Sequence, residues 1–269
     1  MSAPTLLGAE RYDAAGDDRP LPPISLDELT ARSALLTRSE RKYVVDAAVA
    51  TTLLAAAAAE RARVLTIEGA TWFRYRSVYF DTPERQLFGD AAHRRPMRTK
   101  VRTRSYLDGG GCWLEVKRRD RLGTTAKSRR PHDGRAADTI DAAERPFIDA
   151  AADKPGLAGR LVPTLTTSYR RRTLGWADER VTFDADVELV AADGARAHLA
   201  RRVIIETKTT GGPGAADRLL WRLGVRPQRW SKYGVGLAAL DPTLPDNAWH
   251  RSIARFVRVQ PRADRTASS

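Results

Sequence analysis

Polar and apolar side chains alternate along several segments of this chain, and such alternation is typical of β-strands, whose successive side chains point to opposite faces. In residues 98–106, "RTKVRTRSY", every second position from Arg98 to Arg104 is a cation, with Thr and Val between. Further strands are predicted over 74–84, 112–119, 164–174, 179–190 and 201–208. The glycine-rich turn at 107–111 predicts that 98–106 and 112–119 pair as an antiparallel hairpin.

Helices are predicted between these strands. Residues 46–62 are rich in Ala and Leu, with Asp46 at the position of an N-terminal cap. Segments 141–152 and 214–224 also read as helices, and a short helix is expected after Ser25. Since strands and helices do not alternate regularly, the order indicates an antiparallel α+β fold.

The four cations of 98–104 raise a physical problem, because they share one face of a single strand. Side chains two residues apart lie roughly 7 Å from each other on a strand. At an effective dielectric near 20, each neighbouring pair of cations costs about 2.4 kcal/mol, or roughly 7 kcal/mol for three pairs. A whole domain is stable by only about 5–15 kcal/mol. The face must therefore be solvated or matched by anions, and Glu115 and Glu206 supply too little charge for all the cations.

A closed barrel would resolve this problem. We expect the polar strand faces to point into a wet tunnel and the apolar faces to point outward under the helices, with a ligand supplying the missing negative charge. The predicted fold is thus an antiparallel, eight-stranded β-tunnel barrel with a charged interior, flanked by helices.

Composition narrows the class of partner. The 269 residues carry a net charge of +13, which predicts a polyanionic partner, although an arginine-rich composition from a high-GC genome would account for part of the excess. The single cysteine, Cys112, fits a reducing compartment. No run approaches the ~18 apolar residues of a membrane span, and the first residues lack the features of a signal peptide. A cytoplasmic protein without a transmembrane segment is expected.

Eight short motifs occur in order along the chain: "ERKYVV" (40–45), "SVYFDT" (77–82), "KVRTR" (100–104), "LEVKRR" (114–119), "SYRRR" (168–172), "RVTFD" (180–184), "IIETK" (204–208) and "SKYG" (231–234). Together they resemble the VTC domain, the polyphosphate polymerase domain of the triphosphate tunnel metalloenzyme, or CYTH-like, superfamily. The resemblance implies a tunnel of eight antiparallel strands and divides the chain into a flexible leader (1–33), the VTC-like tunnel domain (34–245) and a basic tail (246–269).

The resemblance also implies roles for individual residues. It implies a divalent ion, Mn²⁺ or Mg²⁺, with Glu206 as its acidic ligand. Catalytic roles are implied for Arg102, Arg104, Lys117, Arg171, Arg180 and Glu206. Binding of the phosphate chain is implied for these cations together with Lys42, Lys127, Tyr169, Lys208 and Lys232. The implied reaction moves the γ-phosphoryl group of ATP onto a growing polyphosphate chain.

Alternatives remain within and outside this family. In the hydrolase and cyclase members of the superfamily that this chain resembles, the first strand has the pattern ExExK. At the corresponding positions this chain has Arg38, Glu40 and Lys42. Replacement of the first acid by a cation weakens a water-activating metal site and favours the polymerase over an inorganic or nucleoside triphosphatase. A polyphosphate-binding module without catalysis is a further alternative. Nucleic-acid binding is disfavoured, because the sequence has no RNP, KH or zinc pattern.

The glycine-rich segment 207–220 adjoins a predicted helix, and a helix N-terminus can bind phosphate. A plain connection between strand and helix is the favoured interpretation of this segment. No P-loop motif is present.

Overall fold

The computed structural model describes residues 21–34 and 38–261; the first 20 residues of the predicted leader and the last eight of the predicted tail lie outside this range. The described chain forms two compact units. Unit 1 takes its residues from 1–73, 170–187 and 199–228, and unit 2 from 74–169, 188–198 and 229–269. Strands β8 (Val162–Trp176) and β9 (Glu179–Ala191) contribute residues to both units.

Unit 1 is a sheet covered by helices. Its strands are β1 (Pro23–Ile24), β2 (Arg38–Asp46), β3 (Arg63–Leu65), β11 (Arg202–Thr210) and parts of β8 and β9. Strand β11 lies between β2 and β9 and is antiparallel to both; β3 is antiparallel to β8, whereas β1 pairs parallel to β3. The helices are α1 (Leu26–Ala34), α2 (Ala47–Ala59) and α5 (Ala215–Arg222).

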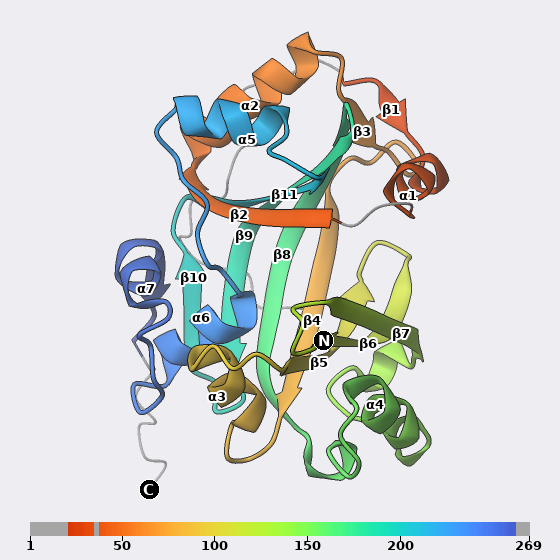
Figure 1. Ribbon diagram of the computed structural model, residues 1–269, viewed down its shortest axis with the longest axis vertical. Helices are drawn as coiled ribbons and strands as arrows, with labels where there is room; N and C mark the ends of the chain where they lie inside the picture. The colour runs from red at the N-terminus through yellow and green to blue at the C-terminus, as the bar shows by residue number, and fades with distance from the viewer. Residues whose placement is uncertain (1–20, 35–37, 262–269) are drawn as a thin grey trace, which may run out of the picture. The chain divides into compact units, whose positions relative to one another are not determined.

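The core of unit 1 follows the predicted strand faces. Val45 of β2, Phe183 of β9 and Ile205 of β11 are buried in one cluster with Leu53 of α2 and Leu220 of α5. Helices α2 and α5 lie side by side (Figure 1), and α2 also packs on β2 and β11. The apolar side chains of these strands are therefore used for packing, which leaves the opposite face to charged residues.

Unit 2 contains β4 (Phe73–Asp81), β5 (Arg98–Tyr106), β6 (Gly111–Arg119), β7 (Thr125–His132), β10 (Arg196–Leu199) and β12 (Val257–Val259). The ladders β4–β5, β5–β6 and β6–β7 are antiparallel. The helices are α3 (Gln86–Ala92), α4 (Arg145–Ala152), α6 (Lys232–Leu240) and α7 (His250–Phe256), with three short 3-10 helices at Gly134–Ala136, Ala142–Glu144 and Ala158–Arg160.

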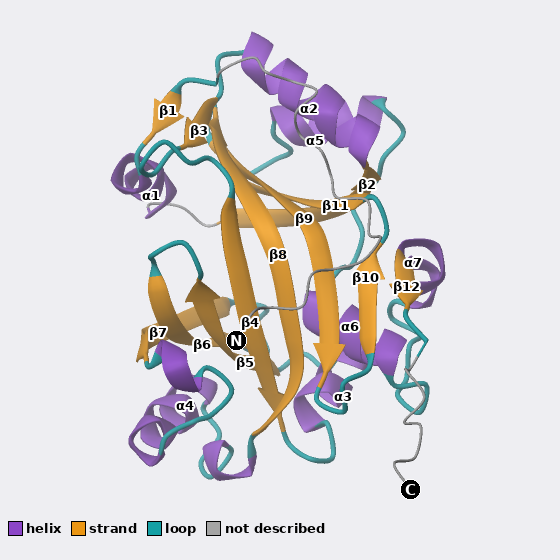
Figure 2. Ribbon diagram, turned by 180° about the vertical axis from the view of Figure 1, so that it is seen from behind, coloured by secondary structure: helices purple, strands orange, loops and turns teal. Residues whose placement is uncertain are grey.

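The core of unit 2 again uses the apolar faces of its strands. Val101 of β5 and Leu114 and Val116 of β6 are buried with Leu87 of α3 and Ile148 of α4. Figure 2 shows α4 beside β6 and β7. The cations of β5 lie on the face of that strand opposite Val101, as the alternation predicted.

The predicted α+β class is confirmed. Eight of the described strands have eight or more residues, namely β2, β4 to β9 and β11. In the order of hydrogen-bonded neighbouring strands, β7 of unit 2 is the last strand. Within the described part of unit 2, no ladder joins β7 to β12 at the other end of the order. None of the helices in residues 21–34 and 38–261 is both long and apolar enough to cross a membrane.

One local expectation was wrong. Asp46 occupies the N-cap position of α2, but its side chain makes no capping hydrogen bond. It pairs instead with Arg202 of the neighbouring strand β11. An ion pair across the β2–β11 ladder thus takes the place of the predicted cap.

Candidate functional site

In unit 1, a glutamate lies among cations on the charged face of strands β2, β8 and β11. Glu206 Oε1 lies 2.7 Å from Lys208 Nζ, and Glu206 Oε2 lies 3.4 Å from Lys42 Nζ. Lys42 also donates to Glu40, and the β2–β11 register sets Glu206 opposite Lys42 and Lys208 opposite Glu40. We call Glu40, Lys42, Arg171, Glu206 and Lys208 the Glu206 cluster.

The charge of Glu206 is fixed by these neighbours. Burial alone would raise the pKa of Glu206, but Lys42, Lys208 and Arg171 outweigh burial and hold it well below the usual glutamate value. Glu206 is therefore a carboxylate at neutral pH. Thr182, directly opposite on β9, has a buried hydroxyl oxygen without a hydrogen-bond partner among the described residues. The cluster thus combines an ionised acid with a polar atom available to a ligand.

Arginines from β8 and β9 complete this face. Arg171 donates to both oxygens of buried Asp184, at 2.5 and 2.8 Å. Arg180 lies opposite Lys208 in the β9–β11 ladder. Burial lowers the pKa of Lys208, and the charges of Arg180 and Arg171 lower it further while Glu206 opposes them. Positive charge is therefore concentrated around Glu206, and the carboxylates of Glu40 and Asp184 offset part of it.

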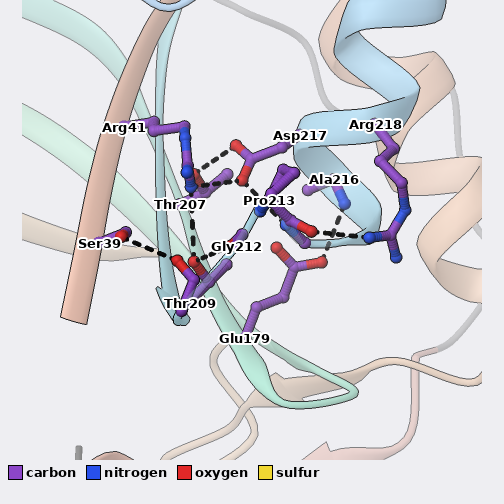
Figure 3. A network of polar contacts seen from close by, with 12 residues as sticks. Ser39, Arg41, Glu179, Thr207, Thr209, Gly212, Pro213, Ala216, Asp217 and Arg218 are labelled. Carbon is purple, nitrogen blue, oxygen red and sulfur yellow. Dashed lines mark hydrogen bonds and ion pairs between the residues drawn. The ribbon is translucent and has the colours of Figure 1, made fainter. Parts of the chain in front are cut away.

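A buried polar network keeps β2 and β11 in register behind this cluster (Figure 3). Asp217 of α5 is fully buried. Its Oδ1 accepts from Tyr43 and Thr207, both at 2.7 Å, and its Oδ2 accepts from Arg41 at 3.0 Å. Tyr43 and Thr207 adjoin Lys42 and Glu206 in sequence, so Asp217 positions both strands of the cluster.

In the glycine-rich connection before α5, carboxylates also accept hydrogen bonds from backbone N–H groups. Asp217 Oδ2 accepts from the backbone N–H of Gly214 at 3.0 Å, and Glu179 Oε1 accepts from that of Ala216 at 2.9 Å. Burial raises the pKa of Glu179 to about 7. A β-carbon added at Gly214 would lie 2.1 Å from Glu179. This helix N-terminus is filled by the protein's own acids, which agrees with the favoured interpretation of a connection.

In unit 2, a second glutamate lies among cations on strands β5, β6 and β7. Arg102 donates to Glu115 Oε2 from Nε and from Nη2, at 2.8 and 2.7 Å. Lys127 donates to Glu115 Oε1 at 2.6 Å, and Arg104 Nε lies 3.9 Å from Oε2. We call Arg102, Arg104, Glu115 and Lys127 the Glu115 cluster. Burial would raise the pKa of Glu115, but these three cations hold it well below the usual value.

Arg104 is the member of the Glu115 cluster with spare donor capacity. Its side chain is almost fully buried, and its Nε makes no hydrogen bond among the described residues. Its guanidinium lies 5.8 Å from the ring centre of Tyr75, which stacks on Tyr169 at 5.2 Å. Lys232 Nζ lies 4.2 Å from the Tyr169 ring centre. Arg104 and Lys232 are thus connected through two stacked tyrosines.

A buried aspartate positions the start of α6, where Lys232 lies. Asp81 accepts from the backbone N–H groups of Leu87 and Phe88 at the start of α3, each at 2.8 Å, and from the hydroxyl of Tyr233. Burial raises the pKa of Asp81. The motifs "SVYFDT" and "SKYG", far apart in sequence, therefore meet in this contact.

The predicted site residues fall into two groups. Unit 1 contains Lys42, Arg171, Arg180, Glu206 and Lys208, and unit 2 contains Arg102, Arg104, Lys117, Lys127, Tyr169 and Lys232. Lys117 lines a cavity of unit 2 together with other cations, among them Arg98 and Arg119. Asp217, Asp81 and Glu179 were not predicted, since a single acid next to a helix start has no distinguishing sequence pattern.

Comparison with known proteins agrees with the motifs. A family model described as the VTC domain matches residues 37–241. No curated protein matches the chain. Among solved structures, a protein described as a candidate adenylate cyclase from Bacillus halodurans is 15% identical, covering 71% of this chain and 92% of its own, with a TM-score of 0.48.

A candidate adenylyl cyclase from Hippeastrum, described as having a dominant triphosphatase activity, is 16% identical, covering 79% of this chain and 100% of its own, with a TM-score of 0.47. The PH1819 protein of Pyrococcus horikoshii is 14% identical, covering 75% of this chain and 99% of its own, with a TM-score of 0.43. The family match confirms the resemblance found in the sequence.

Proposed function

Because the chain belongs to the VTC domain family, we propose that it transfers the γ-phosphoryl group of ATP to a growing chain of inorganic polyphosphate. The observation that carries this proposal is the Glu206 cluster, in which Lys42, Lys208 and Arg171 surround one ionised glutamate. Such a cluster has the charge to bind phosphoryl groups and an acid to hold a metal ion. We propose the cytoplasm as its location, since Cys112 is a free, buried thiol.

The residues of the Glu206 cluster fit a phosphate-bound Mg²⁺ or Mn²⁺. The described residues contain no group of three His, Cys, Asp or Glu side chains able to hold a metal ion. Magnesium, however, is usually bound through one or two carboxylates together with substrate phosphates and water. Glu206 would hold the ion, with Glu40 in the same cluster and the buried hydroxyl of Thr182 beside it. When bound, the ion would neutralise charge on phosphate oxygens.

The cations supply the rest of the chemistry. In phosphoryl transfer, charge is spread over the equatorial oxygens, so the protein acts mainly by positioning and electrostatic stabilisation. We propose that Lys42, Arg171, Arg180 and Lys208 bind phosphate oxygens in unit 1. We propose the same for Arg102, Arg104, Lys117, Lys127 and Lys232 in unit 2, with Tyr169 orienting Lys232. The acceptor phosphate is itself the nucleophile, so no serine or cysteine nucleophile is required.

A cation at the start of β2 favours transfer over hydrolysis. Position 38 is Arg, where hydrolases of this kind have an acid, and Glu40 is the first acid on this strand. A site with fewer carboxylates is poorer at activating water. It is better suited to a long anionic chain, which is why we propose a polymerase and not a triphosphatase.

Two parallel incubations test this proposal. One contains the purified protein, Mn²⁺ or Mg²⁺, ATP and a short polyphosphate primer; the other contains the metal ion and inorganic triphosphate. A ladder of lengthening polyphosphate, lost in Glu206→Gln and in Arg102→Ala/Arg104→Ala, is the expected result. Phosphate release from triphosphate without a ladder would identify a hydrolase. Tight polyphosphate binding with neither reaction would identify a binding module.

A further inference from the structure

The turn between β6 and β7 in unit 2 exposes a leucine almost completely. This turn is residues 120–124, "DRLGT", and Leu122 lies in its middle. The side chain of Leu122 is 92% exposed, whereas the other exposed large hydrophobic residues of the described chain are 38–54% exposed. Half-exposed leucines are common on protein surfaces. A leucine that lies almost entirely in solvent at the tip of a hairpin is a different feature and requires its own explanation.

Hydrogen bonds within the turn hold Leu122 in this exposed position. The backbone N–H of Asp120 donates to Thr124 O at 3.0 Å, and that of Gly123 donates to Asp120 O at 3.2 Å. Arg119 Nε donates to Gly123 O at 3.2 Å. Gly123 has a φ of 86°, a left-handed conformation that glycine adopts readily. The exposure of Leu122 is therefore a property of an ordered turn.

A second loop lies beside this turn. Residues 93–97, "HRRPM", connect α3 to β5, and Arg121 Nε donates to the Met97 sulfur at 3.3 Å. The side chain of Met97 is 42% exposed. We call residues 93–97 and 119–124 the Leu122 surface. It therefore presents two apolar side chains from two neighbouring loops.

The Leu122 surface is also basic. It contains four arginines and one acid, namely Arg94, Arg95, Arg119, Arg121 and Asp120. All four arginines are exposed. The acid is engaged within the turn, since Asp120 Oδ1 accepts from the backbone N–H of Thr124 at 2.8 Å. The exposed apolar tip is thus accompanied by cations of the same two loops.

We propose that the Leu122 surface docks this protein on an anionic lipid membrane, with Leu122 and Met97 entering the boundary between headgroups and acyl chains. Interfacial binding combines buried apolar area with attraction to anionic lipids, and this surface offers both. Arginine suits such a boundary, because its apolar stem can lie along acyl chains while its guanidinium stays among the headgroups. The inference goes beyond the proposed transfer reaction and does not rest on it.

A lipid boundary fits this surface better than a protein partner does. A specific protein interface buries about 800 Å² on each partner and needs a matching shape. One turn and one short loop form a small, projecting surface, and a lipid boundary accepts projecting side chains without a matching pocket. Basic side chains near an anionic leaflet each add to the attraction.

Co-sedimentation of the full chain with vesicles tests the inference. One set of vesicles contains equal parts of phosphatidylcholine and phosphatidylglycerol, and the other contains phosphatidylcholine alone. Inorganic triphosphate is added to both, so that cations able to bind free phosphate are already occupied. The wild-type protein should sediment with the anionic vesicles and much less with the neutral ones.

Leu122→Ser should weaken binding to the anionic vesicles about tenfold, as expected for the loss of one buried leucine side chain. The matched control is Leu107→Ser, because Leu107 is a 47% exposed leucine in the neighbouring turn between β5 and β6. This control should bind as the wild type does. Leu122→Ser should also keep the wild-type affinity for triphosphate, because its side chain makes no charge contact.

The cations are tested separately. Arg95→Ala/Arg121→Ala should weaken vesicle binding about fivefold for each cation removed. Arg95→Lys/Arg121→Lys should retain most of the binding. The control Arg135→Ala/Arg145→Ala removes the same charge from exposed positions of unit 2 outside the Leu122 surface and should bind almost as the wild type does.

A label at the tip gives a second measurement. A polarity-sensitive fluorophore on Leu122→Cys should shift to shorter wavelength with anionic vesicles, and the same label on Leu107→Cys should not; Cys112 is buried. Unchanged vesicle binding in Leu122→Ser, or an equal loss in Leu107→Ser, would overturn the inference. So would a wild-type protein that triphosphate releases from the vesicles, since phosphate-binding cations would then hold it there. Absence of wild-type binding to anionic vesicles would also overturn it and would indicate a protein as the occupant.

Discussion

Each unit contains one segment with the pattern Glu-x-Lys, and the glutamates of the two segments differ in exposure and in the cations that they contact. In "EVK" of β6, Glu115 is 2% exposed and both of its oxygens accept from cations on neighbouring strands, at 2.6 to 2.8 Å. In "ETK" of β11, Glu206 is 13% exposed and contacts Lys208 of its own strand and Lys42 of β2. Lys117, the lysine of the first segment, lines a cavity of unit 2 together with Arg98 and Arg119.

This difference shows that the side chains on neighbouring strands, and not the Glu-x-Lys spacing within a strand, determine the role of a buried carboxylate. Glu115 is already saturated by Arg102 and Lys127, so it acts as an internal counterion. The lysines beside Glu206 are about one quarter exposed, and Glu206 itself is accessible. We therefore propose a structural role for Glu115 and a ligand-binding role for Glu206.

The largest expected effect is on stability, from Glu115→Gln. Removing this charge leaves Arg104, which is 10% exposed, and the partly exposed Arg102 and Lys127 without their counterion, and breaking an ion pair to a buried carboxylate in this way costs about 3–5 kcal/mol. The free energy of unfolding, measured in denaturant, should fall by that amount. The matched variant Glu206→Gln should lose only about 1 kcal/mol, since Glu206 is 13% exposed against 2% for Glu115 and lies as far as 3.4 Å from Lys42. Equal losses would break the distinction between the two glutamates.

A third glutamate, Glu179, extends the comparison to the pH dependence of stability. Glu179 is buried beside α5 without a bonded cation, and burial raises its pKa from 4.5 to about 7. At Glu179 the folded state then binds more protons than the unfolded state between these values, so the contribution of Glu179 to stability is fully present below pH 4.5 and is lost as pH rises through 7. Glu179 should contribute a loss of about 3 kcal/mol across this window.

Denaturant unfolding at pH 5 and pH 8 checks this prediction. Glu179→Gln should flatten the pH dependence, and the exposed control Glu68→Gln should leave it as in the wild type. A wild-type protein that gains stability from Glu179 on going to pH 8 would contradict the assigned direction.

The next effect is on activity. Glu206→Gln should reduce phosphoryl transfer by at least about 100-fold, because a neutral amide is a much weaker ligand for a divalent ion than a carboxylate. Rates at several Mn²⁺ concentrations would measure this loss. A rate within a few-fold of the wild type would assign Glu206 to structure, as for Glu115.

The smallest effect is expected at Lys232. Lys232→Met removes the cation from Tyr169 while keeping the length of the side chain. Lys232 is partly exposed, and a charge contact with phosphate at such a position contributes about 1 kcal/mol or less, so triphosphate affinity should fall about fivefold or less. Titration against Lys154→Met, which removes a lysine paired with Asp90, provides the control. Equal effects in the two variants would remove the binding role proposed for Lys232.

Much of the fold could be predicted from sequence alternation. Val181, Phe183 and Ala185 lie in the core of unit 1, as their spacing on β9 predicted. Strand β7 was missed, because its side chains "TAKSRRPH" are mostly exposed and have no apolar alternation. Its register depends on pairing with β6. A left-handed φ of 53° at Asp186 also interrupts the predicted face of β9, so Asp184 pairs with Arg171 and Asp186 with the adjacent Arg170.

The candidate site could be predicted less completely. The motifs identified Glu206 and its lysines and left Glu115 out of the site, but they did not predict that Arg102 and Lys127 bind both oxygens of Glu115. The cavity of unit 2 that Lys117 lines could not be predicted, because Arg229, which is distant in sequence from Arg98, comes close to it only through the tertiary fold. Asp217, which orders Tyr43 and Thr207 from α5, is likewise brought to these strands by packing and not by sequence spacing.

The most direct test of the proposed transfer reaction is to measure whether the γ-phosphoryl group of ATP enters polyphosphate or is released as free phosphate. The purified protein is incubated with γ-labelled ATP, Mn²⁺ and a polyphosphate primer, and the label is divided between polyphosphate and free phosphate. Our account predicts that most of the label enters the chain, and that Glu206→Gln reduces this incorporation at least about 100-fold. Label released only as free phosphate, or incorporation unaffected by Glu206→Gln, would contradict it.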